Sequence, residues 1–203
     1  MKSSFKYALL IVVCTSFASA QEFHLGIRSG LGASALRGHN ALQSLSFGPN
    51  VVKLHPAFSA SAGLAFAVEV NRLFSIAPEL QYTLYQAKGE LTLKTGDGFD
   101  DLRRAGVNLH SLELPFLVRF NIGSAYIEAG PQVGANLYAV LYKNNELKKP
   151  KVNVLAFGPS LGGGVNIKGA LFGLRGHFGL LEYAKKTNGY PWAVQASVGK
   201  FLF

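Results

Sequence analysis

Cysteine is almost absent from the chain. The single cysteine, Cys14, lies in the N-terminal apolar stretch, so we expect no disulfide and no cysteine-bound metal in the remainder. Val13 precedes Cys14 where a lipid-attachment site would carry a small residue. Charged residues make up only 15% of the 203 residues, and no later apolar run has the length of a membrane helix. These absences exclude a disulfide-stapled domain and a helical membrane protein.

Residues 1–20 have the features of a secretory signal peptide. Lys2 and Lys6 precede a short apolar run, and the Ala-Ser-Ala at 18–20 matches an A-x-A cleavage pattern. We expect cleavage to leave one exported domain, residues 21–203, which is long enough for a substantial core. Without the two leader lysines the net charge falls from +9 to +7. For an exported chain, this charge favours anionic lipid or polysaccharide as a partner and argues against nucleic acid.

After the leader, apolar and polar side chains alternate. In FSIAPELQYTLY (74–85), the even positions carry Phe, Ile, Pro, Leu, Tyr and Leu, and the odd positions carry Ser, Ala, Glu, Gln, Thr and Tyr. Four further stretches repeat this period of two, and no helical period is evident outside the leader. The pattern predicts β-strands with one apolar face and one polar face.

Eight strands are predicted, and the connections between them alternate in length. The strands lie near 22–32, 58–70, 73–86, 106–121, 124–140, 152–167, 169–183 and 191–203. Short connections (NRL, NIGS and KG) alternate with long ones near 33–57, 87–105, 141–151 and 184–190. Membrane barrels have short periplasmic turns and long external loops. The sequence therefore predicts an all-β, eight-stranded antiparallel up-and-down transmembrane β-barrel in the bacterial outer membrane.

The composition of the polar faces indicates which side of the sheet faces lipid. These faces carry mainly Ser, Gly, Ala and Gln with isolated charges, whereas a sheet face in water is normally rich in Lys, Glu and Thr. Such residues suit a narrow, filled interior, so we expect the apolar faces to contact lipid. The side chains expected on the lipid side include Phe66, Leu80, Phe116 and Phe178. A soluble exported lipocalin-like binder, with the two faces exchanged, is an alternative.

Three stretches carry motifs that occur together in one protein family. They are Pro78-Glu79-Leu80-Gln81-Tyr82, Leu112-Glu113-Leu114-Pro115 and Glu128-Ala129-Gly130-Pro131-Gln132. With the aromatic last strand, they resemble the PorT-like outer-membrane β-barrel proteins of the Bacteroidetes and related phyla. The resemblance covers essentially the whole exported chain and implies the barrel fold, but it says little about activity. One named member supports a secretion system of gliding bacteria, so a small transport or secretion-accessory barrel is an alternative function.

The chain ends in ASVGKFLF. Its final aromatic residue resembles that of outer-membrane barrels in general. The resemblance implies that the barrel-assembly machinery recognises the last strand through Phe203. We expect Phe201 and Phe203 to face lipid in a periplasmic aromatic girdle. The apolar residues of 192–198 have the opposite parity. This difference predicts either a bulge near Gly199 or a last strand that is apolar on both faces.

Parity places eight charged side chains in the predicted lumen. They are Arg28, Glu69, Glu79, Glu113, Arg119, Glu128, Arg175 and Lys200. Buried charges are costly unless paired, so four acids and four bases predict a neutral, structural salt-bridge core. We expect at least one Arg to bridge two of the Glu residues. A gated polar path or a small ligand pocket is the alternative, because eight strands enclose room only for side chains or one small ligand.

No catalytic, cofactor or metal site is predicted. His110 beside Ser111, near three loop aspartates, is the only candidate catalytic set, yet adjacent strand residues face opposite sides. The aspartates are Asp97, Asp100 and Asp101. No histidine and acid have the spacing of metal ligands. The stretch GPSLGGGVN lacks the Lys-Ser/Thr ending of a phosphate loop, so we expect its glycines to allow close packing inside the barrel.

The four long connections, counted with the strand-end Glu182, together carry +6 of the +7 that remains after the leader. This bias predicts contact with lipopolysaccharide phosphates or another anionic surface polymer, and ordinary solvated loops are the alternative. We expect a monomeric, non-enzymatic protein with a structural or surface-interaction role. Its expected partners are outer-membrane lipid, lipopolysaccharide and an unidentified surface or secretion partner.

Overall fold

The computed structural model describes residues 22–38, 52–94, 100–143, 146–184 and 189–202, and these form nine strands. The strands are β1 (Phe23–Arg37), β2 (Val52–Glu69), β3 (Phe74–Lys94), β4 (Asp100–Ile122), β5 (Ala125–Lys143), β6 (Glu146–Lys148), β7 (Leu155–Ile167), β8 (Ala170–Phe178) and β9 (Tyr190–Phe201). No helix among these residues is long and apolar enough to cross a membrane. The predicted signal peptide lies outside the described residues.

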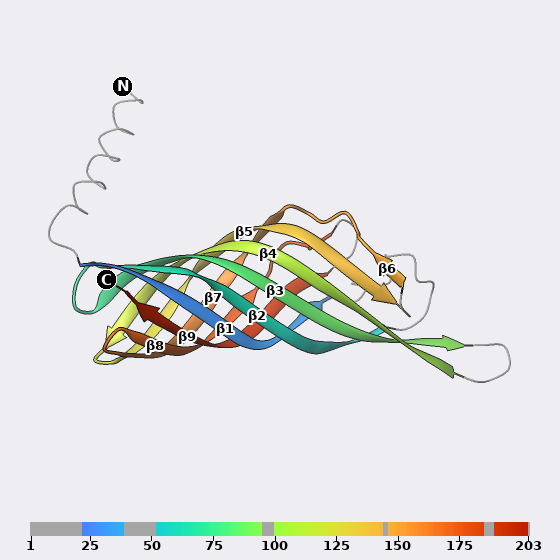
Figure 1. Cartoon of the computed structure of the whole chain (residues 1–203), viewed down its shortest axis with the longest axis horizontal. Helices are drawn as coiled ribbons and strands as arrows, with labels where there is room; N and C mark the ends of the chain where they lie inside the picture. Colours follow the sequence, from blue (N-terminus) through green and yellow to red (C-terminus); the bar gives the residue numbers. More distant parts are fainter. Residues whose placement is uncertain (1–21, 39–51, 95–99, 144–145, 185–188, 203) are drawn as a thin grey trace, which may run out of the picture.

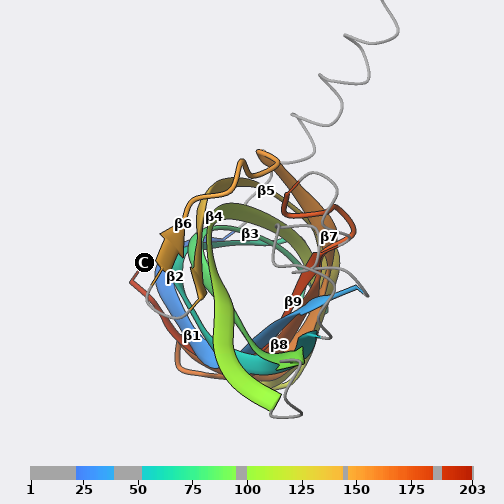
Figure 2. The ribbon, with the colours of Figure 1, turned by 90° about the vertical axis from the view of Figure 1, so that its right-hand side faces the viewer.

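Eight of the strands close into an antiparallel barrel (Figures 1 and 2). Successive strands pair with each other, and the barrel closes because β1 also pairs with β9, from Gly26 opposite Phe201 to Arg37 opposite Tyr190. The three-residue β6 pairs only with the end of β5. The predicted eight-stranded up-and-down barrel is therefore confirmed.

Tight turns join the strands at one end of the barrel. At the β2–β3 turn, the Asn71 side chain accepts hydrogen bonds from the backbone N–H groups of Leu73 and Phe74, both at 2.9 Å. At the β7–β8 turn, Lys168 and Gly169 have φ angles of 51° and 80°, a region that favours glycine. The start of β1 and the end of β9 also lie at this end of the barrel (Figure 1). In an outer-membrane barrel this is the periplasmic end.

At the opposite, outer end, strand structure continues into segments predicted to be loops. The β3–β4 hairpin extends well beyond the rest of the barrel (Figure 1), so most of the predicted loop 87–105 is strand. The alternation persists there, since Ala87 and Gly89 are buried and Lys88 is exposed. By contrast, β8 ends at Phe178, because the chain turns inward before Tyr183. The predicted strand 169–183 was therefore too long.

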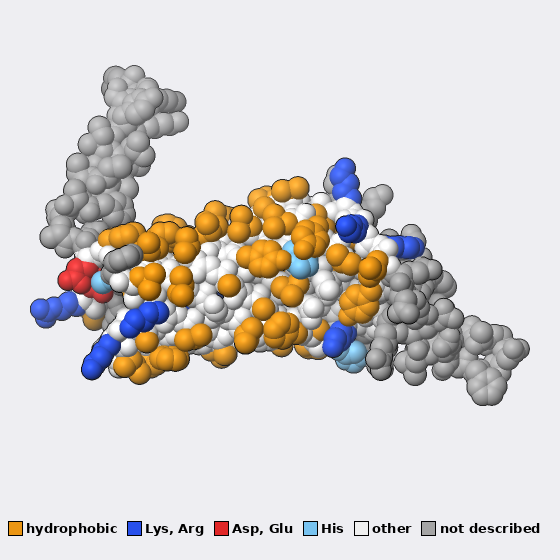
Figure 3. Space-filling view, in the orientation of Figure 1, with side chains coloured by type: hydrophobic (Ala, Val, Ile, Leu, Met, Phe, Trp, Pro, Cys, Tyr) orange, Lys and Arg blue, Asp and Glu red, His pale blue; other side chains and the backbone are white. Residues whose placement is uncertain are grey.

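The outer surface of the barrel is apolar. Phe116 is 53% exposed, and Leu80 and Phe178 are also exposed, while Phe66 is half-buried. On the face drawn in Figure 3, apolar side chains are spread along the barrel, and Lys and Arg gather at both ends. Charged and polar side chains fill part of the interior. This arrangement rules out the soluble lipocalin-like alternative, whose apolar face would line the lumen.

The last strand corrects one prediction. Pairing of β9 with β1 and β8 runs without a register shift, so no bulge forms at Gly199. Val194 and Val198 point outward, and strict alternation therefore turns Phe201 into the barrel mouth, where it packs 5.5 Å from the His24 ring. Phe201 does not face lipid, and Leu202, 56% exposed, takes the outward position. Phe203 lies outside the described residues.

Replacing Phe116 with Arg should destabilise the barrel by about 2–4 kcal/mol, because Phe116 lies on the lipid face away from either rim. Ile122→Arg is the matched control on the same strand. Ile122 is 60% exposed at the periplasmic end of β4, where the same change should cost about 0–1 kcal/mol. Urea unfolding in lipid vesicles measures both, and equal costs at the two sites would contradict the assigned membrane position.

Candidate functional site

The barrel interior is the candidate functional site. From the periplasmic end upward it contains an open mouth, a layer of paired charges, a layer of polar side chains and an apolar plug. We call the second of these the ionic layer, and it consists of Arg28, Glu79, Arg119, Glu128 and Arg175. All five are buried, and they come from five different strands. The layer therefore ties the barrel together across its lumen.

Two arginines of the ionic layer share the same two glutamates. Arg28 Nη1 lies 3.0 Å from Glu79 Oε1 and 3.0 Å from Glu128 Oε1. Arg175 Nη1 lies 2.6 Å from Glu79 Oε2, and Arg175 Nη2 lies 2.6 Å from Glu128 Oε1. Charge-assisted bonds of this kind are stronger than neutral ones and fix geometry. The predicted bridging of two Glu residues by an Arg is confirmed twice.

Arg119 completes the layer on the side nearer the mouth. Its Nη2 lies 2.9 Å from Glu128 Oε2, the oxygen that Arg28 and Arg175 leave unoccupied. The Arg119 guanidinium carbon also lies 4.4 Å from the centroid of the Tyr126 ring. The Tyr126 hydroxyl accepts a hydrogen bond from Arg28 Nη2 at 3.3 Å. Tyr126 therefore contacts two of the three arginines, a role that its position on the polar face did not reveal.

The close contact between Arg175 and Glu128 depends on a glycine, Gly162. Gly162 lies between Glu128 and Arg175 in the sheet, paired to Glu128 on one side and to Arg175 on the other. A Cβ atom at Gly162 would lie 3.2 Å from Glu128 Oε1 and 2.9 Å from the carbonyl oxygen of Leu174. The missing side chain lets Glu128 and Arg175 meet above it. The glycines of GPSLGGGVN thus permit close packing inside the barrel, as expected.

Glu113 lies in the polar layer, and among the described residues it pairs with no arginine. Its Oε1 accepts a hydrogen bond from Tyr85 at 2.7 Å, and its Oε2 accepts from Thr83 at 2.7 Å and from Gln81 at 3.3 Å. Three hydroxyl and amide donors thus replace the expected guanidinium. Gln132 lies in the same layer, and a cavity of about 10 Å³ beside it has room for about one water molecule.

Glu69 and Lys200 lie outside the ionic layer. The Glu69 side chain is 47% exposed at the mouth, where its Oε1 lies 3.8 Å from His24 Nε2. Lys200 is exposed and donates to the backbone oxygen of Lys168 at 3.5 Å. Parity gave Glu69 the correct side of the sheet, but Glu69 does not join the buried charge network. Lys200 has the outward parity of Val198, because no bulge shifts the end of β9.

The outer half of the lumen is apolar, which the prediction of a polar core did not include. The apolar plug consists of Leu36, Tyr85, Ala87, Val107, Leu109, Ala139, Leu141, Tyr183, Ala184 and Ala193. Tyr183 is fully buried and enters from the segment after β8, held by a backbone hydrogen bond from its N–H to the carbonyl of Gly189. Burial raises the pKa of the Tyr183 phenol. The plug lies above the charged and polar layers, in the outer half of the lumen.

The candidate catalytic set is not assembled. His110 faces outward and stacks on Tyr138, with ring centroids 4.2 Å apart, and it contacts the Tyr82 hydroxyl. Ser111 points inward and donates to Asn136 Oδ1 at 2.8 Å. The two side chains therefore lie on opposite sides of the sheet, as expected for adjacent strand residues. The side chains of the three loop aspartates lie outside the described parts.

These features define a small outer-membrane β-barrel with a buried salt-bridge network. The chain belongs to the outer membrane protein beta-barrel domain family, whose model matches residues 17–182. No curated protein matches it. Neisserial surface protein A is similar in structure, with a TM-score of 0.51 and 12% identity over 87% of this chain and 96% of its own.

Two further solved structures are similar at lower TM-scores. Ail, the attachment invasion locus protein of Yersinia pestis, solved with the heparin analogue sucrose octasulfate, has a TM-score of 0.47 and 10% identity over 89% of this chain and 98% of its own. OprG of Pseudomonas aeruginosa has a TM-score of 0.47 and 12% identity over 90% and 97% of the two chains.

A double-mutant cycle on Arg119 and Glu128 tests the ionic layer. Glu128→Gln should cost about 3–5 kcal/mol, because it leaves three buried arginines short of a partner. Arg119→Met alone should cost less, since Glu128 keeps Arg28 and Arg175. The pair should show a coupling energy of about 0.5–3 kcal/mol.

Urea unfolding in detergent and heat-modifiable gel mobility measure the cycle. The control is Glu69→Gln at the mouth, which should change stability by no more than about 0.5 kcal/mol. A chelator is present so that no metal ion bound near Glu69 contributes to the result. Additive effects of the Arg119 and Glu128 changes would mean that the two side chains are separately solvated.

Proposed function

We propose that this chain is a non-enzymatic outer-membrane barrel that binds lipopolysaccharide phosphates at its outer rim and serves as a closed structural element of the cell surface. The observation that carries the proposal is a cluster of exposed cations at the outer end of the apolar barrel surface. Its described members are Arg37, Lys88, Lys148, Lys149 and Lys151. In a lipopolysaccharide leaflet, the phosphates lie at this level, immediately above the acyl chains that the apolar surface contacts.

A groove at the outer rim supports this assignment. Arg37, Phe178, Gly179, Tyr190, Pro191 and Trp192 line a cavity of about 240 Å³. Its walls are mainly aromatic, and the Arg37 guanidinium carbon lies 5.9 Å from the centroid of the Tyr190 ring. An acyl chain fits the apolar part, and a phosphate fits beside the guanidinium, which binds phosphate in a bidentate manner. The groove thus presents both chemical features of a lipid anchor.

A secretion-accessory role is the second candidate. The three motif stretches that resemble the PorT-like family support it, as does the open periplasmic mouth, a cavity of about 410 Å³ where a periplasmic partner has access. In that case the barrel is a membrane anchor for a periplasmic assembly. Passage of a solute through the lumen is disfavoured, because the ionic layer and the apolar plug fill it.

The test is binding of fluorescent lipopolysaccharide to the detergent-solubilised barrel. Each cation near an anionic membrane surface contributes about 1 kcal/mol, so Lys148, Lys149 and Lys151 replaced together by Gln should weaken binding about 100-fold. The matched control replaces three exposed cations at the periplasmic rim by Gln, namely Arg72, Lys168 and Lys200. It should leave the affinity for lipopolysaccharide unchanged. Equal losses in the two triple variants would show that only net charge matters and would contradict a site at the outer rim.

A further inference from the structure

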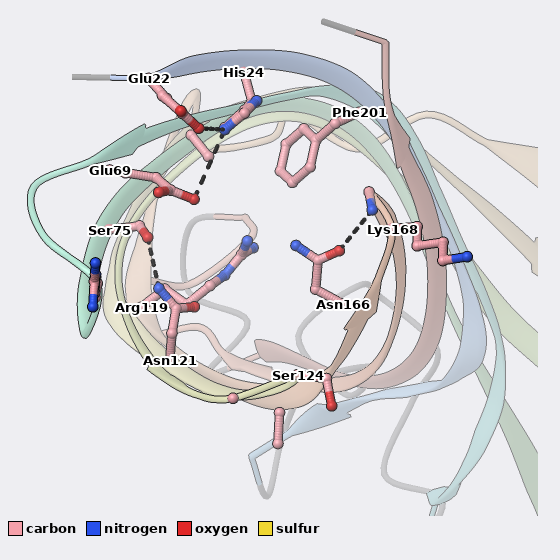
Figure 4. A pocket seen from close by; sticks show the side chains of 15 residues that line it. Glu22, His24, Glu69, Ser75, Arg119, Asn121, Ser124, Asn166, Lys168 and Phe201 are labelled. Atoms are coloured by element: carbon pink, nitrogen blue, oxygen red, sulfur yellow. Dashed lines mark hydrogen bonds and ion pairs between the residues drawn. The ribbon is translucent and has the colours of Figure 1, made fainter. Parts of the chain in front are cut away.

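The periplasmic mouth brings together one histidine and two glutamates that the ionic layer does not use. Glu22 and His24 are two positions apart at the start of β1, so their side chains share the inward face, and Glu69 ends the neighbouring β2. His24 Nε2 lies 3.7 Å from Glu22 Oε2 and 3.8 Å from Glu69 Oε1. One donor atom from each of the three lies within 4.8 Å of the others. Figure 4 shows the three side chains side by side at the edge of the mouth.

The two carboxylates are close for a reason of sheet geometry, and their proximity has a cost. The Glu69 N–H donates to the Glu22 carbonyl at 3.2 Å, so the two residues are neighbours across adjacent strands. Like charges opposite each other destabilise a sheet, and the exposure of both residues reduces this cost without removing it. A divalent cation bound by both carboxylates would cancel their two negative charges.

We propose that Glu22, His24 and Glu69 bind a divalent transition-metal ion of the zinc class. Imidazole nitrogen with carboxylate oxygen is a donor set that Zn²⁺ accepts, in a tetrahedral arrangement with a fourth position for water. Ligand atoms at zinc distances are about 3.4 Å from one another. The two distances from His24 exceed this by a few tenths of an ångström, and the two carboxylates, within 4.8 Å of each other, would move closer by side-chain rotation. The mouth cavity, about 410 Å³, leaves room for the water.

Phe201 restricts the movement of one of the proposed ligands, His24. Its ring lies 5.5 Å from the His24 ring and restricts the orientation of the imidazole, as the supporting groups around a metal ligand do. This contact also gives a role to the inward turn of Phe201, which lipid contact alone does not explain. The metal joins the first residues of β1 to the end of β2, at the edge where the strand enters the barrel.

Cations in the same mouth limit the affinity. Arg72, Arg119 and Lys168 line the cavity together with the three ligands, and their positive charge opposes a metal ion. Arg119 is compensated by Glu128, so the opposing charge comes mainly from Arg72 and Lys168. All three ligands are also partly solvated, Glu22 and Glu69 more than His24. We therefore expect a dissociation constant for Zn²⁺ in the micromolar range.

The experiment uses full-length barrel purified from outer membranes without a histidine tag and treated with a chelator. Titration with Zn²⁺ in a calorimeter should show one site, and Co²⁺ should give the visible absorption of a tetrahedral complex. His24→Gln and Glu69→Gln should each weaken Zn²⁺ binding at least about 10-fold and abolish the Co²⁺ bands. Heat-modifiable mobility checks that each variant is folded.

His55→Gln is the matched control, because His55 is an exposed histidine at the outer end of β2. It should leave both signals unchanged. Two results would overturn the proposal: no Zn²⁺ binding up to about 1 mM, or equal affinity in the wild type and in folded His24→Gln and Glu69→Gln. Lipopolysaccharide binding should be unaffected by these variants, so the outcome is independent of the function proposed for the outer rim.

Discussion

The shared ion pairs of Glu79 and Glu128 with three arginines are the interaction on which the rest of the structure depends. A charge in a narrow lumen is tolerated only if its partners are within contact distance, so the five side chains restrict the register of the strands that carry them. Arg28, for example, is paired with Gly199 on the neighbouring β9, where a Cβ atom would lie 3.4 Å from Arg28 Cβ and Cγ, so the glycine leaves space for the long side chain. Barrel closure and the glycine pattern are thus two consequences of one buried layer.

The ionic layer and the apolar plug lie between the outer end of the barrel and its periplasmic mouth, so the two ends are separate surfaces. With the ionic layer and the apolar plug inside the barrel, the outer rim, with its cations and its aromatic groove, is the surface that we propose contacts lipopolysaccharide. At the other end, the mouth is open but shallow, since the ionic layer forms its floor through Arg119. Both proposed binding sites therefore lie at the rims, and the buried ion pairs of the lumen connect the strands.

Alternation and loop lengths were sufficient to predict the strand number, the closure and the inverted faces. Parity also selected the five members of the ionic layer. It could not predict which of the inward charges meet, so Glu69 and Glu113 were also expected in the paired charge core. Glu69 instead lies at the mouth, and Glu113 accepts hydrogen bonds from Tyr85 and Thr83. The inward turn at Tyr183 breaks the strand pattern and left no signal. The cluster of Glu22, His24 and Glu69 combines two strands, so spacing along the chain did not reveal it.

Conductance across a planar bilayer tests the closed interior most directly. The wild type should insert without producing steady, reproducible current steps, under conditions in which a porin does produce them. Tyr183→Ala should behave in the same way, because it opens only the apolar plug and leaves the ionic layer in place. Stable openings of the wild-type protein would contradict the account, since they require a continuous water path past Arg28, Glu79, Glu128 and Arg175.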